Sequence, residues 1–213
     1  MLRVCNELKR VICFKTDNKN EIKLSLNLKN LKYKLIMTEF SRIFAMPNSK
    51  TFSIKPIRQI IEKYIETLPE ESVIIDPFSK DSDYASLSND LDPDTQADFH
   101  LHAIEFLDLM IEEYGENVAD MVLLDPPYSP RQISECYKGI GRKVTSTDTQ
   151  NARLYKECKD RLKKLLAPGG IAITFGWNSG GFGKKRKFQM LEILMVYHGA
   201  AHNDTIVTVE RKL

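Results

Sequence analysis

Short apolar runs that end in aspartate alternate along this chain with segments of helical period, and this alternation restricts the fold more than any other feature. The runs at 73–75 (VII) and 121–124 (MVLL) end at Asp76 and Asp125, and residues 171–175 (IAITF) form a third run. Strands that are buried on both faces read as continuous apolar runs. The three runs therefore indicate a parallel sheet with helices on both faces.

Between and beside the runs, other segments carry the periodicities of helices and strands. Amphipathic helices are predicted over residues 57–68, which follow Pro56, over 102–114 and over 155–166. The β-rich runs 191–197 and 205–210 predict an antiparallel pair. Strands that alternate with helices predict an α/β fold with a mostly parallel sheet.

The composition is that of a globular protein, because 42% of the 213 residues are hydrophobic and 28% are charged. No long apolar window predicts a transmembrane helix, and the first residues lack the pattern of a secretory signal. Cys5, Cys13, Cys136 and Cys158 do not have zinc-binding spacing. We therefore expect no metal site, no membrane and a reducing, cytoplasmic location.

The net charge of +2 hides an asymmetry between two parts of the chain. Residues 1–36 hold nine Lys and Arg against three Asp and Glu, which gives +6 and leaves −4 for residues 37–213. Leu24, Leu26 and Leu28 alternate with polar residues, which permits a strand. We interpret residues 1–36 as a basic, poorly ordered extension that is dispensable for the chemistry, and residues 37–213 as the catalytic domain.

The strongest motif is Asp125-Pro126-Pro127-Tyr128, directly after the apolar run at 121–124. Ligands of open α/β sheets bind beyond the carboxyl ends of the strands, where this motif is predicted to lie. A carboxylate and a carbonyl can together accept both protons of an exocyclic amine, and a tyrosine ring can stack on a flat heterocycle. The alternative interpretation is a rigid turn with a buried tyrosine.

Two further acidic residues are predicted at the same edge of the sheet. Asp76 precedes Pro77 and Phe78, and Asp90 ends the next predicted strand, where such folds accept hydrogen bonds from a ribose. Each motif is weak alone, because Asp-Pro and Asn-Asp sequences are common in turns.

Taken in order, the Lys-Pro, Asp-Pro-Phe, acidic, Asp-Pro-Pro-Tyr and Pro-Gly-Gly segments of residues 50–213 resemble the amino-methyltransferases that methylate adenine N6 or cytosine N4 in DNA. The resemblance is strongest to small adenine-specific methylases of phages and mobile elements. It implies a Rossmann-like methyltransferase fold, with a mostly parallel seven-stranded sheet and an antiparallel last strand, and S-adenosylmethionine as the cofactor. It assigns catalysis to Asp125, Pro126, Pro127 and Tyr128. It assigns cofactor binding to Phe52, Ser53, Lys55, Pro56, Asp76, Pro77, Phe78 and Asp90.

The chain departs from this family at two places. The family usually has Gly-x-Gly after Asp-Pro-Phe, whereas residues 79–82 here are Ser-Lys-Asp-Ser. Because glycines permit close backbone approach, their absence predicts weaker or differently shaped cofactor binding. The family often has Asp where His102 stands, and we interpret His102 as a surface or capping residue rather than a ligand.

The resemblance also implies the substrate, an adenine that leaves double-stranded DNA and stacks on Tyr128. Phosphate contacts are predicted in the long segment 129–153 and in the basic cluster after it, although a solvated basic turn is an equal alternative for the cluster. The predicted contacts are Arg131, Arg142, Lys143, Lys184, Lys185, Arg186 and Lys187. No separate target-recognition domain fits between the motifs, which predicts relaxed sequence specificity or a partner specificity subunit.

Two other functions fit the same motifs. One keeps the cofactor and changes the acceptor to adenine in RNA or to cytosine N4, although Asp rather than Ser before Pro-Pro-Tyr favours adenine. The other is a methylase-fold protein that binds without efficient catalysis, which the missing glycines permit. The oligomeric state does not follow from the sequence.

Overall fold

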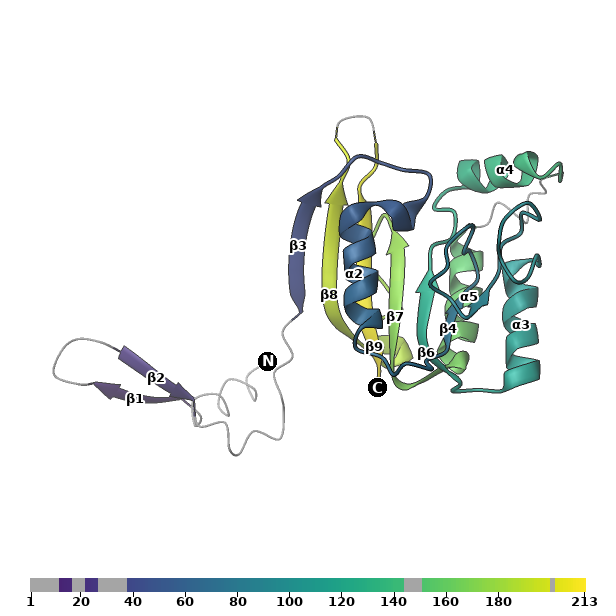
Figure 1. Cartoon of the computed structure of the whole chain (residues 1–213). Helices are drawn as coiled ribbons and strands as arrows, with labels where there is room; N and C mark the ends of the chain where they lie inside the picture. Colours follow the sequence, from purple (N-terminus) through teal and green to yellow (C-terminus); the bar gives the residue numbers. More distant parts are fainter. Residues whose placement is uncertain (1–11, 17–21, 27–37, 144–150, 200–201) are drawn as a thin grey trace. The chain divides into compact units, whose positions relative to one another are not determined.

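A computed structural model of the chain describes residues 12–16, 22–26, 38–143, 151–199 and 202–213 (Figure 1). The chain divides into two units, Met1–Ile36 and Met37–Leu213. The first unit contains an antiparallel hairpin of β1 (Ile12–Thr16) and β2 (Ile22–Leu26), so two of the three alternating leucines lie in a strand. That the second unit is the catalytic domain and that the first unit is dispensable both stay predictions.

The second unit is built on one seven-stranded sheet with the order β3-β8-β9-β7-β6-β4-β5 (Figure 1). Its strands are β3 (Glu39–Phe44), β4 (Ile74–Asp76), β5 (Leu87–Ser88), β6 (Ala119–Leu124), β7 (Leu166–Gly176), β8 (Phe188–Tyr197) and β9 (Thr205–Lys212). Only β9 runs antiparallel to its neighbours, β7 and β8. The predicted fold class, a mostly parallel seven-stranded sheet with an antiparallel last strand, is therefore confirmed.

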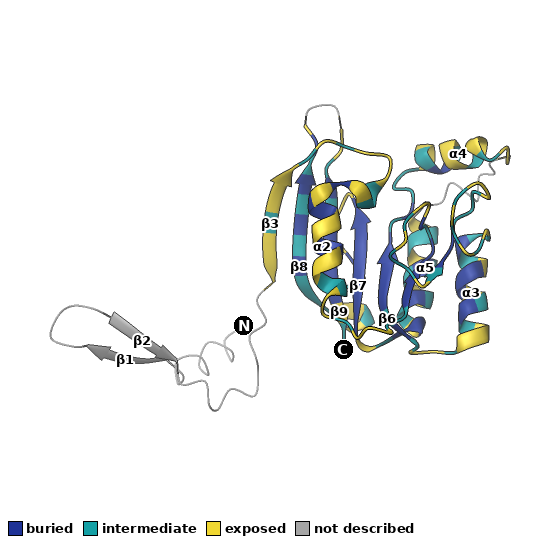
Figure 2. Ribbon diagram, in the orientation of Figure 1, coloured by how far each residue is buried: buried dark blue, intermediate teal, exposed yellow. Residues whose placement is uncertain are grey.

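Helices cover both faces of the sheet (Figure 2). They are α2 (Lys55–Ile65), α3 (Ala103–Tyr114) and α5 (Asn151–Leu165), whereas α4 (Pro130–Gly139) lies beyond the upper edge of the sheet in this view. Alternate residues of the central strands point to opposite faces, so Met121 and Leu123 pack toward α2, while Val122 and Leu124 pack toward α3 and α5. This two-sided burial explains why the central strands are continuous apolar runs.

The predicted helices and the predicted antiparallel pair appear with shifted ends. The helix predicted from residue 102 begins at Ala103, because His102 is its N-cap and its Nδ1 accepts a hydrogen bond from the Ile104 N–H at 3.3 Å. Pro168-Gly169-Gly170, predicted as a turn before a strand, lies inside β7 instead. The register with β6 shifts there, and Gly169 has a φ of +85°. The three residues therefore form a bulge, which the left-handed glycine permits.

Two elements were missed by the sequence analysis. The segment 129–153, predicted as a long loop, contains α4 and the first turn of α5. The strand β3 lies before the region of family resemblance and pairs in parallel with β8 at the edge of the sheet. Within the described residues, no helix is long and apolar enough to cross a membrane.

Candidate active site

The acidic motifs meet at the carboxyl edge of the sheet, the upper edge in Figure 1. Asp76 is the last residue of β4, and Asp125 directly follows β6, which is hydrogen-bonded to β4. Asp90 follows the short strand β5 on the other side of β4. Because all three strands are parallel, one edge of the sheet carries all three carboxylates, as the sequence predicted.

Asp76 is the most deeply buried of the three, with no side-chain or backbone exposure to solvent. Its Oδ1 accepts a hydrogen bond from the Phe78 N–H at 2.9 Å. Its Oδ2 is buried and has no hydrogen-bond partner among the described residues. Burial, assisted by the nearby carboxylates of Asp125 and Asp90, raises the pKa of Asp76 well above the usual value. A buried oxygen without a partner is rare in folded proteins and makes Asp76 a candidate for contact with a donor on a ligand.

The loop after Asp76 keeps a glycine-type backbone without glycine. Lys80 has a φ of +49°, in the left-handed region that favours glycine, and it stands in the segment 79–82 that has no glycine. The Lys80 N–H donates to Asp90 Oδ2 at 3.1 Å, and the Ser79 N–H donates to the carbonyl of Asn89 at 2.9 Å. The Asp90 carboxylate, whose second oxygen accepts from the Asp92 N–H, therefore holds the loop in shape.

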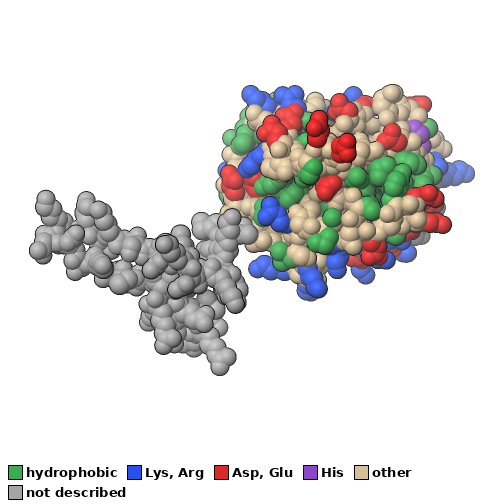
Figure 3. Space-filling view, turned by 60° about the horizontal axis from the view of Figure 1, so that its bottom comes forward, with side chains coloured by type: hydrophobic (Ala, Val, Ile, Leu, Met, Phe, Trp, Pro, Cys, Tyr) green, Lys and Arg blue, Asp and Glu red, His purple; other side chains and the backbone are tan. Residues whose placement is uncertain are grey.

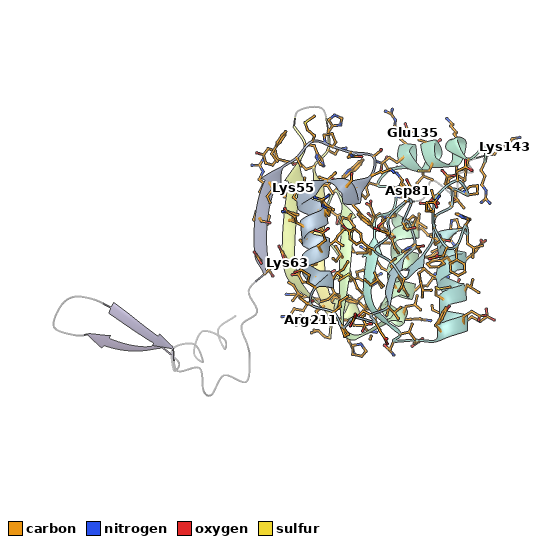
Figure 4. The ribbon with its side chains drawn as sticks, in the orientation of Figure 1. Lys55, Lys63, Asp81, Glu135, Lys143 and Arg211 are labelled. Carbon is orange, nitrogen blue, oxygen red and sulfur yellow. The ribbon has the colours of Figure 1, made fainter. Side chains whose placement is uncertain are left out.

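Two lysines connect this loop to the segment before α2. Lys80 Nζ donates to the carbonyl of Ser49 at 3.0 Å, and Lys50 Nζ forms an ion pair with Asp81 at 2.7 Å. Figure 4 shows Asp81 at the same upper edge as Lys55, the first residue of α2. The two predicted cofactor segments, which are far apart in sequence, thus lie side by side. The contacts between them are made by the side chains of Lys80 and Asp81, and glycines at these positions could not make them.

Asp125 and Tyr128 contact each other directly. The Tyr128 hydroxyl donates to Asp125 Oδ1, and the Tyr128 N–H donates to Gln132 Oε1 at 2.6 Å. Burial raises the pKa of Asp125 above its usual value, while hydrogen bonds from Tyr128 and Thr51 partly lower this pKa. Thr51 lies in the short 3-10 helix Thr51–Ser53, so this hydroxyl is brought from the segment before α2. The Tyr128 hydroxyl thus holds the Asp125 carboxylate in place, and Thr51 lies close to the same carboxylate.

A cavity of about 420 Å³ opens beside Tyr128. Its other lining residues are Ala152, Tyr155, Lys159, Trp177 and Asn178. The rings of Tyr128 and Trp177 meet edge to face with centroids 5.8 Å apart, and the Tyr155 hydroxyl donates to the carbonyl of Phe175 at 2.8 Å. Three aromatic side chains and two side chains with N–H donors form a suitable site for a flat, polar ring.

The loop that carries Trp177 and Asn178 is fixed by a buried glutamate. Glu210, which is 1% exposed, accepts hydrogen bonds from the N–H groups of Phe182 and Gly183. Lys159 Nζ donates to the carbonyl of Gly181 at 2.5 Å, which joins the same loop to the cavity. Glu210 therefore supports the cavity wall from the neighbouring strand β9.

We expect Gly181→Ala to lower the stability of the protein. Gly181 has a φ of +47°, and a Cβ added there would lie 2.1 Å from the Glu210 carboxylate. The strained backbone and the displaced carboxylate together predict a loss of more than about 1 kcal/mol in the free energy of unfolding. Urea unfolding measures this loss. Gly139→Ala, which adds a Cβ in open space, is the matched control. An unchanged midpoint for Gly181→Ala would contradict the role of Glu210.

The other predicted cofactor residues have different surroundings. Phe52 is half-buried, and its ring packs 5.0 Å from the ring of Phe175 and 6.3 Å from that of Tyr84. Ser53 and Lys55 are exposed, whereas Pro56 is buried in the first turn of α2. Pro56 thus packs against the core, whereas Ser53 and Lys55 are accessible at the carboxyl edge.

The prolines and Phe78 support the two acidic turns. The carbonyl of Pro77 accepts a hydrogen bond from Asn89 Nδ2 at 3.1 Å, and Phe78 packs against the core beside α3. Pro126 is buried and Pro127 is half-buried. These residues therefore fix the backbone beside Asp76 and Asp125, as their rigid φ angles suggest.

The structure separates the two groups of predicted nucleic-acid contacts. Arg131, Arg142 and Lys143 lie on or just after α4 at the carboxyl edge, where Figure 4 shows Lys143 and Glu135. Arg131 is exposed and pairs with Glu135 at 2.8 Å. These three residues lie at the same edge as Asp125.

The cluster of Lys184, Lys185, Arg186 and Lys187 lies at the opposite edge. It precedes β8, whose first residue pairs with Lys212, and β8 runs parallel to β7, so the cluster is at the amino edge. Arg186 also forms an ion pair with Asp160 at 2.8 Å. Figure 3, which turns this edge forward, shows basic side chains mixed with acidic ones. The structure therefore does not bring this cluster to the acidic motifs.

Sequence reasoning missed three residues that the structure brings into the site, namely Thr51, Tyr155 and Lys159. Tyr155 and Lys159 are four apart on α5, so they share one helix face, but only the tertiary structure directs that face to the cavity. Lys80 was noted as a replacement for glycine, whereas its contacts with Asp90 and Ser49 were not foreseen.

The sheet order, the antiparallel β9 and the acidic turns at the carboxyl edge define a Rossmann-like methyltransferase fold. No family model and no curated protein matches the chain. Solved structures similar to it include TrmN from Thermus thermophilus (17% identity, 75% of this chain and 49% of that chain, TM-score 0.45). PH0851 (12%, 100% and 57%, TM-score 0.44) and NSun6 from Pyrococcus horikoshii with SFG (14%, 72% and 51%, TM-score 0.46) are also similar. The chain spans about half of the length of these proteins.

Proposed function

We propose that this protein transfers a methyl group from S-adenosylmethionine to the exocyclic N6 of adenine in double-stranded DNA. The observation that carries the proposal is the Asp125 carboxylate, held at a strand end beside Tyr128 and an aromatic cavity of about 420 Å³. This arrangement offers an acceptor for an amine next to rings on which a base can stack.

The residues at the carboxyl edge fit the cofactor. The unpartnered Asp76 Oδ2 is suited to a cationic or N–H-bearing group, and the partly exposed Asp90 carboxylate is suited to hydroxyl groups. Asp76, Asp90 and the exposed Ser53 and Lys55 are the residues that would hold it. When bound, S-adenosylmethionine supplies an electrophilic methyl group on a sulfonium.

The chain's own residues would activate the amine by position and charge. Asp125 and the Pro126 carbonyl would accept the N–H bonds of the amine, which frees the nitrogen lone pair from conjugation with the ring. The proton that the amine then loses can pass to Asp125, whose pKa is raised by burial. Catalysis of this kind rests on orientation and stabilisation of developing charge rather than on a strong base.

Tyr128 has two separable roles, which its variants should distinguish. We expect Tyr128→Ala to lower the rate of methyl transfer, because the loss of base stacking costs about 1–3 kcal/mol. We expect Tyr128→Phe to keep most of the rate, because the ring remains while the bond that occupies Asp125 Oδ1 is lost. Initial rates with labelled cofactor measure both. Equal losses in the two variants would contradict the stacking role.

The substrate is tested by expressing the protein in a host without DNA methylation and sequencing the modified bases. The proposal predicts N6-methyladenine in host DNA, at a short or relaxed site. Modified cytosine alone, or methylated adenine in RNA alone, would replace the proposed substrate with the alternative one. Calorimetry with S-adenosylmethionine tests the remaining alternative, a methylase-fold protein without efficient catalysis. A protein that does not bind the cofactor cannot transfer its methyl group.

A further inference from the structure

The strand β3 is the last strand at one edge of the described sheet. Among the described residues, no strand pairs with its outer edge. Figure 2 shows β3 exposed along nearly its whole length, and its apolar side chains include Phe40 (63% exposed) and Phe44 (51%). Exposed, unpaired edges of this kind are templates for pairing with another chain, and soluble proteins usually protect them with outward charges.

The two charges of β3 do not give this protection. Glu39 is turned toward α2, where Lys63 Nζ lies 3.3 Å from its carboxylate. Arg42 lies over the ring of Tyr197 on β8, with 4.4 Å between the guanidinium carbon and the ring centroid. Both charged groups thus lie against their own protomer.

The backbone of β3 is also suited to pairing. The Ala45 N–H donates to the carbonyl of Tyr197 on β8 at 3.2 Å, so the odd-numbered residues turn their N–H and C=O groups toward β8. Backbone groups alternate along a strand, so Phe40, Arg42 and Phe44 direct theirs outward. The strand β3 has six residues, three of which direct an N–H and a C=O group outward. This is a normal length for a strand that pairs with another strand.

We propose that β3 pairs antiparallel with β3 of a second copy of this chain, about a twofold axis through Ser41. In this register Phe40 lies opposite the partner's Arg42, and Arg42 lies opposite the partner's Phe40. The guanidinium and the ring are a favourable pair once Arg42 turns from the Tyr197 ring of its own protomer to the partner's ring, and twofold symmetry forms this pair twice. The register centred on Arg42 would place two arginines directly opposite each other, which is destabilising.

The expected result is a dimer of the full-length chain, with a molar mass near twice 24.5 kDa by light scattering over a concentration series. In the proposed register, Phe40→Lys places a lysine opposite the partner's Arg42, and the twofold symmetry repeats this repulsion. We expect the variant to raise the dimer dissociation constant at least about tenfold. Because Phe40 is exposed, its replacement should leave the far-ultraviolet circular dichroism unchanged. The midpoint of thermal unfolding should fall only as far as the lost dimerisation explains, so it should no longer rise with protein concentration. Tyr114→Lys, which removes an exposed aromatic residue from the end of α3, is the matched control and should stay dimeric.

The register is tested by oxidative cross-linking. Residues 41 of the two copies form a non-hydrogen-bonded pair with Cα atoms about 4.5 Å apart, which is within disulfide range. Ser41→Cys should therefore cross-link to itself, as identified by mass spectrometry of the peptides, whereas Ile43→Cys should not. A monomeric wild-type chain, a dimer that is insensitive to Phe40→Lys, or the absence of the link between the two residues 41 would each overturn the proposal.

Discussion

Replacing Asp125 with asparagine should lower the rate of methyl transfer by about 10²–10³-fold while leaving cofactor affinity within a few-fold of wild type. The amide keeps the shape of the carboxylate and can still accept from Thr51 or Tyr128. The amide lacks the negative charge that would stabilise the developing positive charge on the amine. Its own NH2 group is a hydrogen-bond donor, so it cannot accept a hydrogen bond from the N–H groups of the amine. Single-turnover rates with labelled S-adenosylmethionine measure the first effect, and calorimetry measures the second.

The matched control for Asp125 is Asp94→Asn, which removes one carboxylate from the exposed loop after β5. Its transfer rate should equal that of wild type, so general loss of negative charge is separated from loss of the acceptor. Wild-type transfer by Asp125→Asn would show that catalysis does not use this carboxylate, and Thr51 and Tyr128 would then hold a structural residue only.

Replacing Asp76 with asparagine should have two effects of opposite direction. Cofactor affinity should fall by at least about tenfold, because a charged hydrogen bond is worth about 1.5–3 kcal/mol. The ligand-free protein should become more stable at neutral pH, because the variant no longer buries a carboxylate with an unpartnered oxygen. A residue with a purely structural role would lose stability instead.

The stability effect of Asp76 has a defined pH dependence. Burial raises the pKa of Asp76 in the folded state, so the folded protein binds a proton more tightly than the unfolded chain does. The free energy of unfolding of wild type should therefore decrease with increasing pH above the unfolded pKa, by up to about 1.4 kcal/mol per pH unit, until the folded pKa is passed. The difference in stability between Asp76→Asn and wild type should grow over the same window.

Urea unfolding without ligand at several pH values measures this difference. Asp83→Asn, which removes an exposed carboxylate from the same loop, is the control and should show no such trend. If the difference in the free energy of unfolding between Asp76→Asn and wild type did not change with pH, the pKa of Asp76 would not be raised in the folded protein. Cofactor binding would then have to be explained by other groups.

The central strands were predictable from sequence because helices bury them on both faces, which imposes continuous apolar runs ending at Asp76 and Asp125. The strand β3 was not predictable in this way, since only Ser41 is partly buried and no alternation results. The helix α4 buries only Ile133 and holds few apolar residues, so it offers little from which a buried helix face could be predicted. Its N-terminal signal was nevertheless present, because Ser129 caps the helix and Pro130 opens it.

The candidate site shows the same division. Asp76, Asp90, Asp125 and Tyr128 were identified because each lies just after a predicted strand, where topology alone fixes the edge. Lys159 could not be identified, because only the tertiary structure brings its face of α5 to the cavity, where it also bonds to the carbonyl of Gly181. The basic cluster at 184–187 was predicted to contact phosphate because of its charge, and charge alone does not fix the edge of the sheet at which it lies. The chain crosses to the amino edge before reaching it.

Mass spectrometry of nucleosides tests the proposed function most directly. Duplex DNA and RNA are incubated separately with the protein and S-adenosylmethionine carrying a labelled methyl group, with Asp125→Asn as the paired control. We predict labelled N6-methyl-2′-deoxyadenosine from DNA with the wild-type protein and at least about 10²-fold less with the variant. The absence of labelled deoxyadenosine, or an equal yield from both proteins, would contradict the proposed function.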